Sequence, residues 1–287
     1  MRGPHLRRGE AAAAVPGGAR LGPGAVTPRR LTVCADDYGL GPAVDRGILA
    51  LAAQGRITAL SCLVTSKRWP ASGEALEACR AAAGLHFNLT EGEPLSPALR
   101  RHWPRFPSLG RLIALSMAGR LPPAVADEFQ AQLHQFIAVT DAAPAFVDGH
   151  QHVHALPGVR PFALAAAEQL GVPLRNTGRV LGPGFAFKRG VIAACGGRAL
   201  AAQARARGVA MPSALVGVYD FDPRADYRQL VRRWLPSAPD GALLFCHPAL
   251  GEPDPGDVIA AARAREMAYL ASEAFVEDLD AAGISLA

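Results

Sequence analysis

One segment organises the whole sequence: Phe146-Val147-Asp148-Gly149-His150-Gln151-His152-Val153-His154. It places three of the eight histidines and a carboxylate within nine residues, directly after a short apolar run. Neutral imidazoles are ligands for borderline-soft divalent cations, and at this density they are costly as surface decoration. We therefore interpret the segment as a buried strand that leads into one half of a metal site.

Outward from this segment, short apolar runs alternate with segments of helical periodicity. Strands are predicted at residues 31–35, 58–64, 84–89, 145–147, 172–175, 214–218, 241–246 and 284–286. Helices are predicted at residues 42–54, 69–83, 109–120, 125–140, 159–170, 189–207, 227–234 and 258–282. Buried strands that alternate with helices predict an α/β fold, here a single (β/α) barrel of seven or eight parallel strands, TIM-like or distorted.

The distribution of charge separates a tail from the domain. The formal net charge is +5, but residues 1–30 hold six arginines against Glu10, which leaves 24 basic and 24 acidic residues in the remainder. Residues 1–28, rich in Ala, Gly, Pro and Arg, are interpreted as a disordered tail, and residues 29–287 as a barrel domain with an insertion at about 90–123. The neutral domain argues against a nucleic-acid partner.

The sequence also predicts an intracellular setting. No run approaches the roughly 18 apolar residues of a membrane span. The five cysteines are odd in number and lack C-x-x-C spacing, which favours reduced thiols in a cytoplasmic protein. Oligomeric state is left open, and a homodimer is compatible with the sequence.

Polar residues follow several predicted strands at the point where each strand ends. Active sites of (β/α) barrels lie at the carboxyl ends of their strands. Residues far apart in sequence should therefore converge on one rim, and these residues are Asp36, Asp37, His86, His150, Arg175 and His247.

Two imidazoles and one carboxylate are the ligand set of a common type of hydrolytic metal centre. His86, one or more histidines of the cluster, and either Asp36 or Asp37 supply such a set. A bound ion would lower the pKa of water and polarise a carbonyl group. The second aspartate of the pair could take the proton of that water, and His247 could protonate the leaving group. The residues thus predict metal-assisted hydrolysis.

Four segments resemble, in order, the signature segments of the YdjC-like carbohydrate deacetylases (the ChbG/HpnK group). They are Ala35-Asp36-Asp37-Tyr38-Gly39, Gly84-Leu85-His86-Phe87-Asn88-Leu89-Thr90, Asp148-Gly149-His150-Gln151-His152-Val153-His154 and Cys246-His247-Pro248. The resemblance runs from about Leu31 to the C-terminus. It implies a barrel similar to the NodB-type deacetylases, one divalent ion, usually magnesium, and hydrolytic removal of an acetyl group from an N-acetylated sugar or glycolipid.

The same resemblance implies roles for individual residues. Asp36 is expected to be the general base, His247 a candidate acid, and Asp37, His86 and His150 the metal ligands. Zn²⁺ would suit these ligands as well as Mg²⁺, so the native ion stays open. Contacts to the substrate or to the ligands are expected from a further group: Asn88, Asp148, His152, His154 and Arg175.

Two other functions fit parts of the pattern. A barrel phosphoesterase would use metal and histidines, although such sites generally hold two metals and more bridging carboxylates. A non-catalytic carbohydrate-binding relative would keep the scaffold, although both the expected ligand and the expected base are present. Taken alone, Asp36 and Asp37 could cap a helix, and His86 could be a core histidine.

Overall fold

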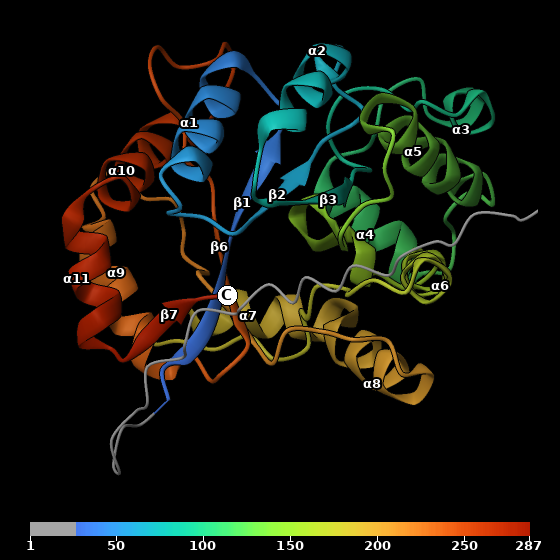
Figure 1. Ribbon diagram of the computed structural model, residues 1–287. Coiled ribbons are helices and arrows are strands. Elements are labelled where there is room, and N and C mark those ends of the chain that lie inside the picture. The colour runs from blue at the N-terminus through green and yellow to red at the C-terminus, as the bar shows by residue number, and fades with distance from the viewer. Residues whose placement is uncertain (1–26) are drawn as a thin grey trace, which may run out of the picture.

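A computed structural model describes residues 27–287, in which seven parallel strands form the centre of the molecule (Figure 1). The strand order is β4-β3-β2-β1-β6-β5, and β7 pairs with β1. Apart from residues 27 and 28, the predicted tail lies outside the described residues. The strands are β1 (Arg29–Tyr38), β2 (Ala59–Cys62), β3 (Ala82–Phe87), β4 (Val147–Gly149), β5 (Leu215–Val216), β6 (Ala242–Cys246) and β7 (Ile284–Leu286).

Strand β1 is central because it is apolar on both faces. Val33, Cys34 and Ala35 are fully buried, as expected for a parallel strand covered on both sides. Cys34 lies opposite Ala59 of β2 on one edge and opposite Phe245 of β6 on the other. The carboxyl end of β1 therefore lies in the middle of the rim.

The barrel is distorted between β4 and β5. The strand predicted at residues 172–175 is reduced to a single bridge between Leu174 and Val147 of β4, and a second bridge joins Val180 to Leu215 of β5. Residues 174–180 thus link the two edge strands by isolated pairs only. The prediction of a distorted barrel with seven or eight parallel strands is confirmed, with seven strands.

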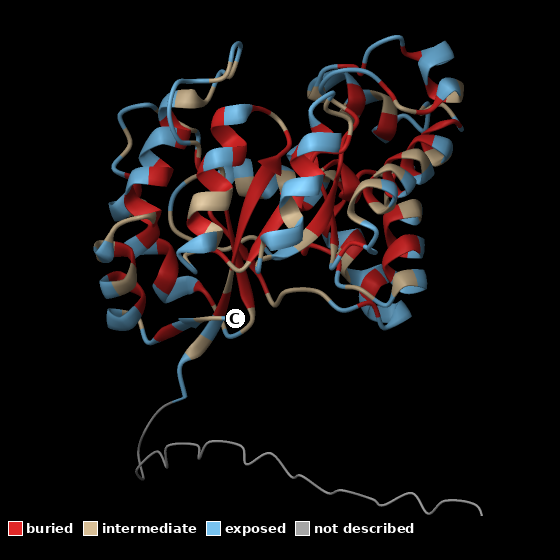
Figure 2. Ribbon diagram, turned by 45° about the horizontal axis from the view of Figure 1, so that its top comes forward, coloured by how far each residue is buried: buried red, intermediate tan, exposed pale blue. Residues whose placement is uncertain are grey.

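Helices surround the sheet and turn their apolar faces toward it (Figures 1 and 2). Four agree closely with the predicted ranges: α1 (Pro42–Ala53), α5 (Val125–Thr140), α6 (Arg160–Leu170) and α9 (Tyr227–Trp234). The others are α2 (Trp69–Glu74), α3 (Pro97–His102), α4 (Leu109–Met117), α7 (Ala186–Ile192), α8 (Arg198–Arg207), α10 (Ala260–Leu270) and α11 (Glu273–Ala281).

Three of the predicted helices are interrupted. Residues 69–83 end early, since Ala82 already pairs with Ala59 in the sheet. The helix predicted at 189–207 breaks between α7 and α8 at Gly196, where a Cβ atom would lie 2.0 Å from the carbonyl oxygen of Ala155. The helix predicted at 258–282 divides at Ser272, whose extended backbone starts α11 while its hydroxyl donates to the Tyr269 carbonyl.

The predicted insertion at about 90–123 contains α3 and α4. Leu99 and Leu112 are fully buried and belong to the main core. The segment is therefore packed onto the barrel near its rim. All five cysteines are free thiols. Among residues 27–287, every helix falls short of the length and apolar character that a bilayer crossing requires.

Candidate active site

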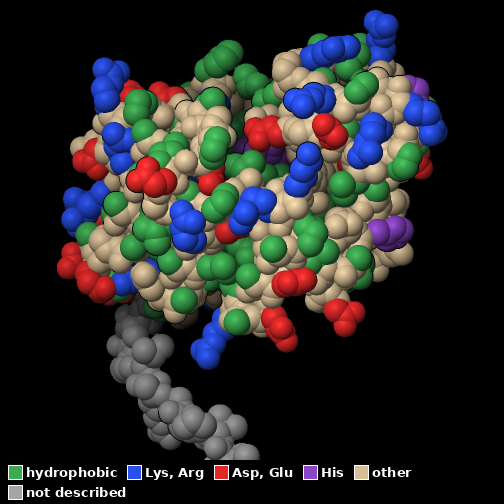
Figure 3. All heavy atoms as spheres, turned by 90° about the horizontal axis from the view of Figure 1, so that it is seen from above, with side chains coloured by type: hydrophobic (Ala, Val, Ile, Leu, Met, Phe, Trp, Pro, Cys, Tyr) green, Lys and Arg blue, Asp and Glu red, His purple; other side chains and the backbone are tan. Residues whose placement is uncertain are grey.

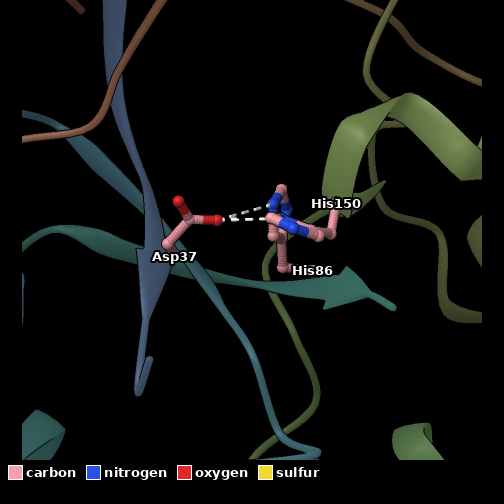
Figure 4. Close-up of side chains that lie close together, drawn as sticks. All are labelled: Asp37, His86 and His150. Carbon is pink, nitrogen blue, oxygen red and sulfur yellow. Dashed lines mark hydrogen bonds and ion pairs between the residues drawn. The ribbon is translucent and has the colours of Figure 1, made fainter. Parts of the chain in front are cut away.

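Asp37, His86 and His150 converge at the carboxyl ends of three strands (Figure 4). Asp37 lies at the end of β1, His86 on β3, and His150 directly after β4 in the short 3₁₀ segment η2 (His150–Ala155). One donor atom of each residue lies within 4.8 Å of the other two, and all three side chains are buried. The convergence expected from the sequence is present.

A bulge in β1 brings two consecutive carboxylates to one cavity. Between its pairs with β2, β1 advances from Ala35 to Tyr38 while β2 advances only from Leu60 to Cys62. Consecutive side chains of a regular strand point to opposite faces, and an extra residue re-aims them. Asp37 adopts a φ of +74°, a strained value for a residue other than glycine. As a result, both Asp36 and Asp37 line the cavity.

His86 is held in position by Asp148. Its Nδ1 lies 2.6 Å from Asp148 Oδ1, which leaves Nε2 facing Asp37 Oδ1 at 3.5 Å. Ser61 donates a hydrogen bond of 2.6 Å to the other carboxylate oxygen of Asp148. A carboxylate behind a ligating histidine fixes its ring orientation and raises its basicity. Asp148 can therefore serve His86 in this way.

Arg175 joins both carboxylates beneath the site. It is 1% exposed, donates one hydrogen bond of 2.6 Å to each oxygen of Asp36, and lies 2.5 Å from Asp148 Oδ2. Such a planar two-pronged contact fixes a carboxylate more firmly than a single bond. The strand predicted at 172–175 is absent, but its last residue supports the site.

His150 is placed by a tight turn after β4. Gly149 allows this turn because a Cβ atom there would lie 2.8 Å from the backbone nitrogen of His154. The ring presents Nδ1 to Asp37 Oδ1 at 2.9 Å. Its other nitrogen, Nε2, lies 3.1 Å from Oε1 of Glu91.

In this cluster, burial and neighbouring charges shift the pKa values in opposite directions, and the charges prevail. Burial alone would raise the pKa of Asp37, but Arg263 and His150 outweigh it and hold that pKa well below its ordinary value. Burial alone would lower the pKa of both His86 and His150. Instead, Asp148 and Asp36 raise the pKa of His86 to about 10, and Asp37 raises the pKa of His150 to about 9. The site therefore favours positive charge between its carboxylates.

A cavity of about 540 Å³ opens above these residues. Figure 3 shows histidine side chains at the bottom of a hollow on this face. Asp36, Asp37, His86 and His150 form its polar floor, while the walls are mainly apolar and include Leu40, Leu109, Ile192, Val218, Phe245 and Ile259. A few convergent polar groups in an apolar cavity are typical of a small-molecule site.

His247 follows β6 and also lines this cavity. Its backbone N–H donates to Glu266 Oε2 at 2.5 Å, and its ring packs edge-on against Phe221 and Phe245. Nδ1 of His247 is buried without a hydrogen-bond partner among residues 27–287. The residue is thus held by its backbone hydrogen bond and by aromatic packing, and Nδ1 of its ring is left available for another hydrogen bond.

The residues predicted to contact the substrate or the metal ligands lie in different places: some line the cavity and others are buried beneath it. His152 lines the cavity beside Phe245, and burial and Arg175 keep its pKa well below the ordinary value. His154 is fully buried, with Nε2 3.1 Å from the Arg175 carbonyl oxygen, and burial lowers its pKa to about 4. Asn88 supports the loop that follows β3, and its side chain contacts Thr65 and the backbone of Glu91.

Sequence reasoning missed two charged residues at the site. Arg263 of α10 is buried, donates a hydrogen bond of 2.7 Å to Asp37 Oδ2, and lies 2.9 Å from Asp257. Glu91 follows the segment that carries His86. Arg263 could not be singled out from the sequence, because it lies in a helix rich in alanine and arginine. Glu91 could have been found, because it is an acidic residue directly after the Asn88-Leu89-Thr90 segment.

The donor set fits one divalent cation. Two imidazoles and one carboxylate converge, and the buried carboxylates Asp36, Asp37 and Asp148 outnumber the buried guanidinium groups of Arg175 and Arg263. Nitrogen and oxygen ligands of this kind suit Zn²⁺, and hard ions such as Mg²⁺ favour the oxygen ligand. The residues are compatible with both ions.

Comparison with known proteins assigns the chain to a family. The model of the family described as "YdjC-like protein" matches residues 30–281. A "Carbohydrate deacetylase" of Mus musculus is 38% identical over 152 residues, which are 50% of this chain and 48% of the mouse protein. A "Chitooligosaccharide deacetylase" of Klebsiella pneumoniae (strain 342) is 35% identical over 155 residues, 51% of this chain and 59% of that protein. The matched regions thus span about half the length of these curated relatives.

Solved structures share the fold at low sequence identity. A crystal structure from Enterococcus faecalis V583, named for the cleavage of cellobiose phosphate, has a TM-score of 0.73 at 23% identity and covers 91% of this chain and 97% of its own. The Bc1960 peptidoglycan N-acetylglucosamine deacetylase has a TM-score of 0.50 at 11% identity and covers 90% and 85%. Both similarities support the distorted barrel.

Proposed function

We propose, from the premise that this chain belongs to the YdjC-like protein family, that it is a metal-dependent hydrolase that removes an acetyl group from an N-acetylated sugar. The observation that carries the proposal is the convergence of Asp37, His86 and His150 beside a second carboxylate, Asp36, in one cavity. The names of the curated relatives support the substrate class, since the mouse and Klebsiella proteins are called carbohydrate and chitooligosaccharide deacetylases.

Asp37, His86 and His150 would hold the ion, and Asp148 would keep His86 turned toward it. When bound, a divalent ion polarises the acetamide carbonyl and makes water acidic enough to attack near neutral pH. The apolar cavity wall would exclude bulk water and so strengthen these charge interactions. The native ion is proposed to be Mg²⁺ or Zn²⁺.

Asp36 would take the proton of the attacking water. Arg175 occupies one side of each carboxylate oxygen, and the carboxylate still lines the cavity. This two-pronged contact fixes the orientation of the Asp36 carboxylate. His247, which lines the same cavity, would donate a proton to the departing amine nitrogen.

Acetate release tests the proposal. Purified protein should release acetate from N-acetylglucosamine oligomers or from acetylated glycolipids, and a chelator should abolish the reaction. Asp36→Asn should still bind the ion but lose hydrolysis, because the amide keeps the shape and loses the base. Equal activity of the two proteins would remove the base assignment. Release of phosphate from a chromogenic phosphate ester, with no acetate released from the sugars, would favour a phosphoesterase.

We also propose that residues 29–287 form one catalytic domain, with residues 90–123 as an insertion beside the cavity. Leu109 of this insertion lines the cavity, which supports a role in substrate contact. The five free thiols support a reducing compartment such as the cytoplasm.

A further inference from the structure

The ring of His150 lies between two carboxylates from distant parts of the chain. Nδ1 lies 2.9 Å from Asp37 Oδ1, and Nε2 lies 3.1 Å from Glu91 Oε1. Nε2 is buried, and among residues 27–287 it has no partner aligned well enough for a hydrogen bond. At 3.1 Å, the Glu91 carboxylate is close enough to accept a hydrogen bond from a proton on Nε2 once the two groups align.

The loop that carries Glu91 is held by a buried polar network. Asn88 Oδ1 accepts hydrogen bonds from the backbone N–H groups of Thr90 and Glu91, and Asn88 Nδ2 donates to the Glu91 carbonyl. The backbone of Asn88 is in turn bound on both sides by the side chain of Gln132 on α5. Buried polar networks that are fully satisfied fix one conformation.

The network extends one step further along the same loop. Gln132 donates to Glu128, whose carboxylate accepts from the backbone N–H groups of Leu95 and Ser96. Both Gln132 and Glu128 are fully buried. Two points of the loop are thus tied to α5, on either side of the side chain that reaches His150.

We propose that Glu91 is a positioning residue for the metal centre, and that its carboxylate orients His150 so that Nδ1 faces the ion. This inference rests on the proposed function, in which His150 is a ligand. A histidine that binds through one nitrogen carries its proton on the other, and a carboxylate there fixes the tautomer and the ring plane. Because Glu91 contacts the ring nitrogen on the far side from Asp37, it acts through His150.

The test is a Mn²⁺ titration of the purified full-length chain, followed by calorimetry. Glu91→Ala should weaken Mn²⁺ binding by about 10- to 100-fold, the usual effect of losing such a partner. Glu91→Gln should lose less Mn²⁺ affinity than Glu91→Ala, because its amide oxygen can still accept a hydrogen bond from His150 Nε2. Glu93→Gln is the matched control: Glu93 lies in the same loop, is about half exposed, and forms a long ion pair with the exposed Arg105 at 3.9 Å. It should bind Mn²⁺ like the wild type.

Two further readouts separate positioning from other roles. The deacetylase activity of Glu91→Ala should return at saturating Mn²⁺, and its metal-free form should melt at the wild-type temperature, because the Glu91 side chain is 46% exposed. Unchanged Mn²⁺ affinity, or an activity loss that excess Mn²⁺ does not restore, would overturn the inference and point to a contact with substrate.

The outcomes also distinguish this inference from the proposed function. If the wild type binds Mn²⁺ and Glu91→Ala binds it weakly, the inference stands even where no acetate is released from the sugars tested. If the wild type binds no Mn²⁺, the metal assignment and this inference fail together.

Discussion

The two histidines proposed as metal ligands, His86 and His150, are supported in opposite ways. His86 lies on a strand of the sheet, and its partner Asp148 lies on the neighbouring strand, fully buried and bound by Ser61 and Arg175. His150 lies in a turn, and its partner Glu91 comes from a loop and is partly exposed. One half of the site is thus built into the barrel, and the other depends on a loop that is tied down by side chains. Substitutions around Asp148 should therefore lower the free energy of unfolding as well as ion affinity. Substitution of Glu91 should weaken ion binding alone.

The largest effect is expected from Arg175→Met. It would leave the carboxylate of Asp36 buried without its cation and would remove one of the two cationic partners of Asp148, whose other partner is His86. Breaking a buried charge pair from one side costs about 3–5 kcal/mol. Urea unfolding of the metal-free proteins should show this loss of unfolding free energy for Arg175→Met, whereas Glu91→Met should lose almost none. Equal losses for the two variants would remove the distinction between the halves.

Asp148→Asn should be the next largest. The amide keeps the shape but removes the charge that holds His86 Nδ1 at 2.6 Å. Metal affinity should fall by about 10- to 100-fold, as for other lost partners of ligating histidines. Part of the fold stability should be lost as well, because the single oxygen of the amide can accept either from His86 or from Ser61 and Arg175, but not from both sides, and it leaves Arg175 without one of its buried anionic partners. An Asp148→Asn protein with wild-type metal affinity would show that His86 needs no partner.

Metal binding should release protons. The pKa values of His86 and His150 are raised to about 10 and about 9 by neighbouring carboxylates, so at pH 7.5 both rings are protonated before an ion enters. Calorimetry in buffers of different ionisation enthalpy should count about two protons released per ion, and affinity should rise with pH up to about 9–10. Proton release of zero at pH 7.5 would contradict these shifts.

The same shifts give a stability window for the metal-free protein. A raised pKa in the folded state contributes stability that is complete below the unfolded value of about 6.5. This contribution should fade as the pH rises through about 9 and 10, where the folded rings lose their protons. The free energy of unfolding, measured by urea between pH 6 and pH 10, should fall over this range and not rise.

The smallest effect is expected at His152. It has a φ of +63°, which asparagine tolerates, and its ring packs against Phe245 away from the three ligands. His152→Asn should keep its metal and lower the unfolding free energy by about 1 kcal/mol, the typical cost of a single substitution, whereas His150→Asn should lose the ion. Metal content by atomic spectroscopy separates the two, and the reverse result would move the ligand within the cluster.

The sequence predicted the barrel half of the site better than the loop half. Asp37, His86 and Arg175 lie in predicted strands or just after them, and parallel strands bring their carboxyl ends together whatever the loops do. The contact of Arg263 with Asp37 spans 226 residues and depends on where α10 packs. The placement of Glu91 depends on hydrogen bonds from Gln132, which no periodicity reveals. The break at Gly196 likewise follows from tertiary packing, because the helical pattern continues across it and the obstacle is the distant carbonyl group of Ala155.

The central claim is that a single divalent ion is bound by Asp37, His86 and His150. The most direct measurement is a crystal structure of the protein soaked with Mn²⁺, with the ion located by its anomalous scattering. We expect one ion per chain in contact with these three side chains. An ion held elsewhere, with the three side chains still paired only to one another at saturating Mn²⁺, would contradict it.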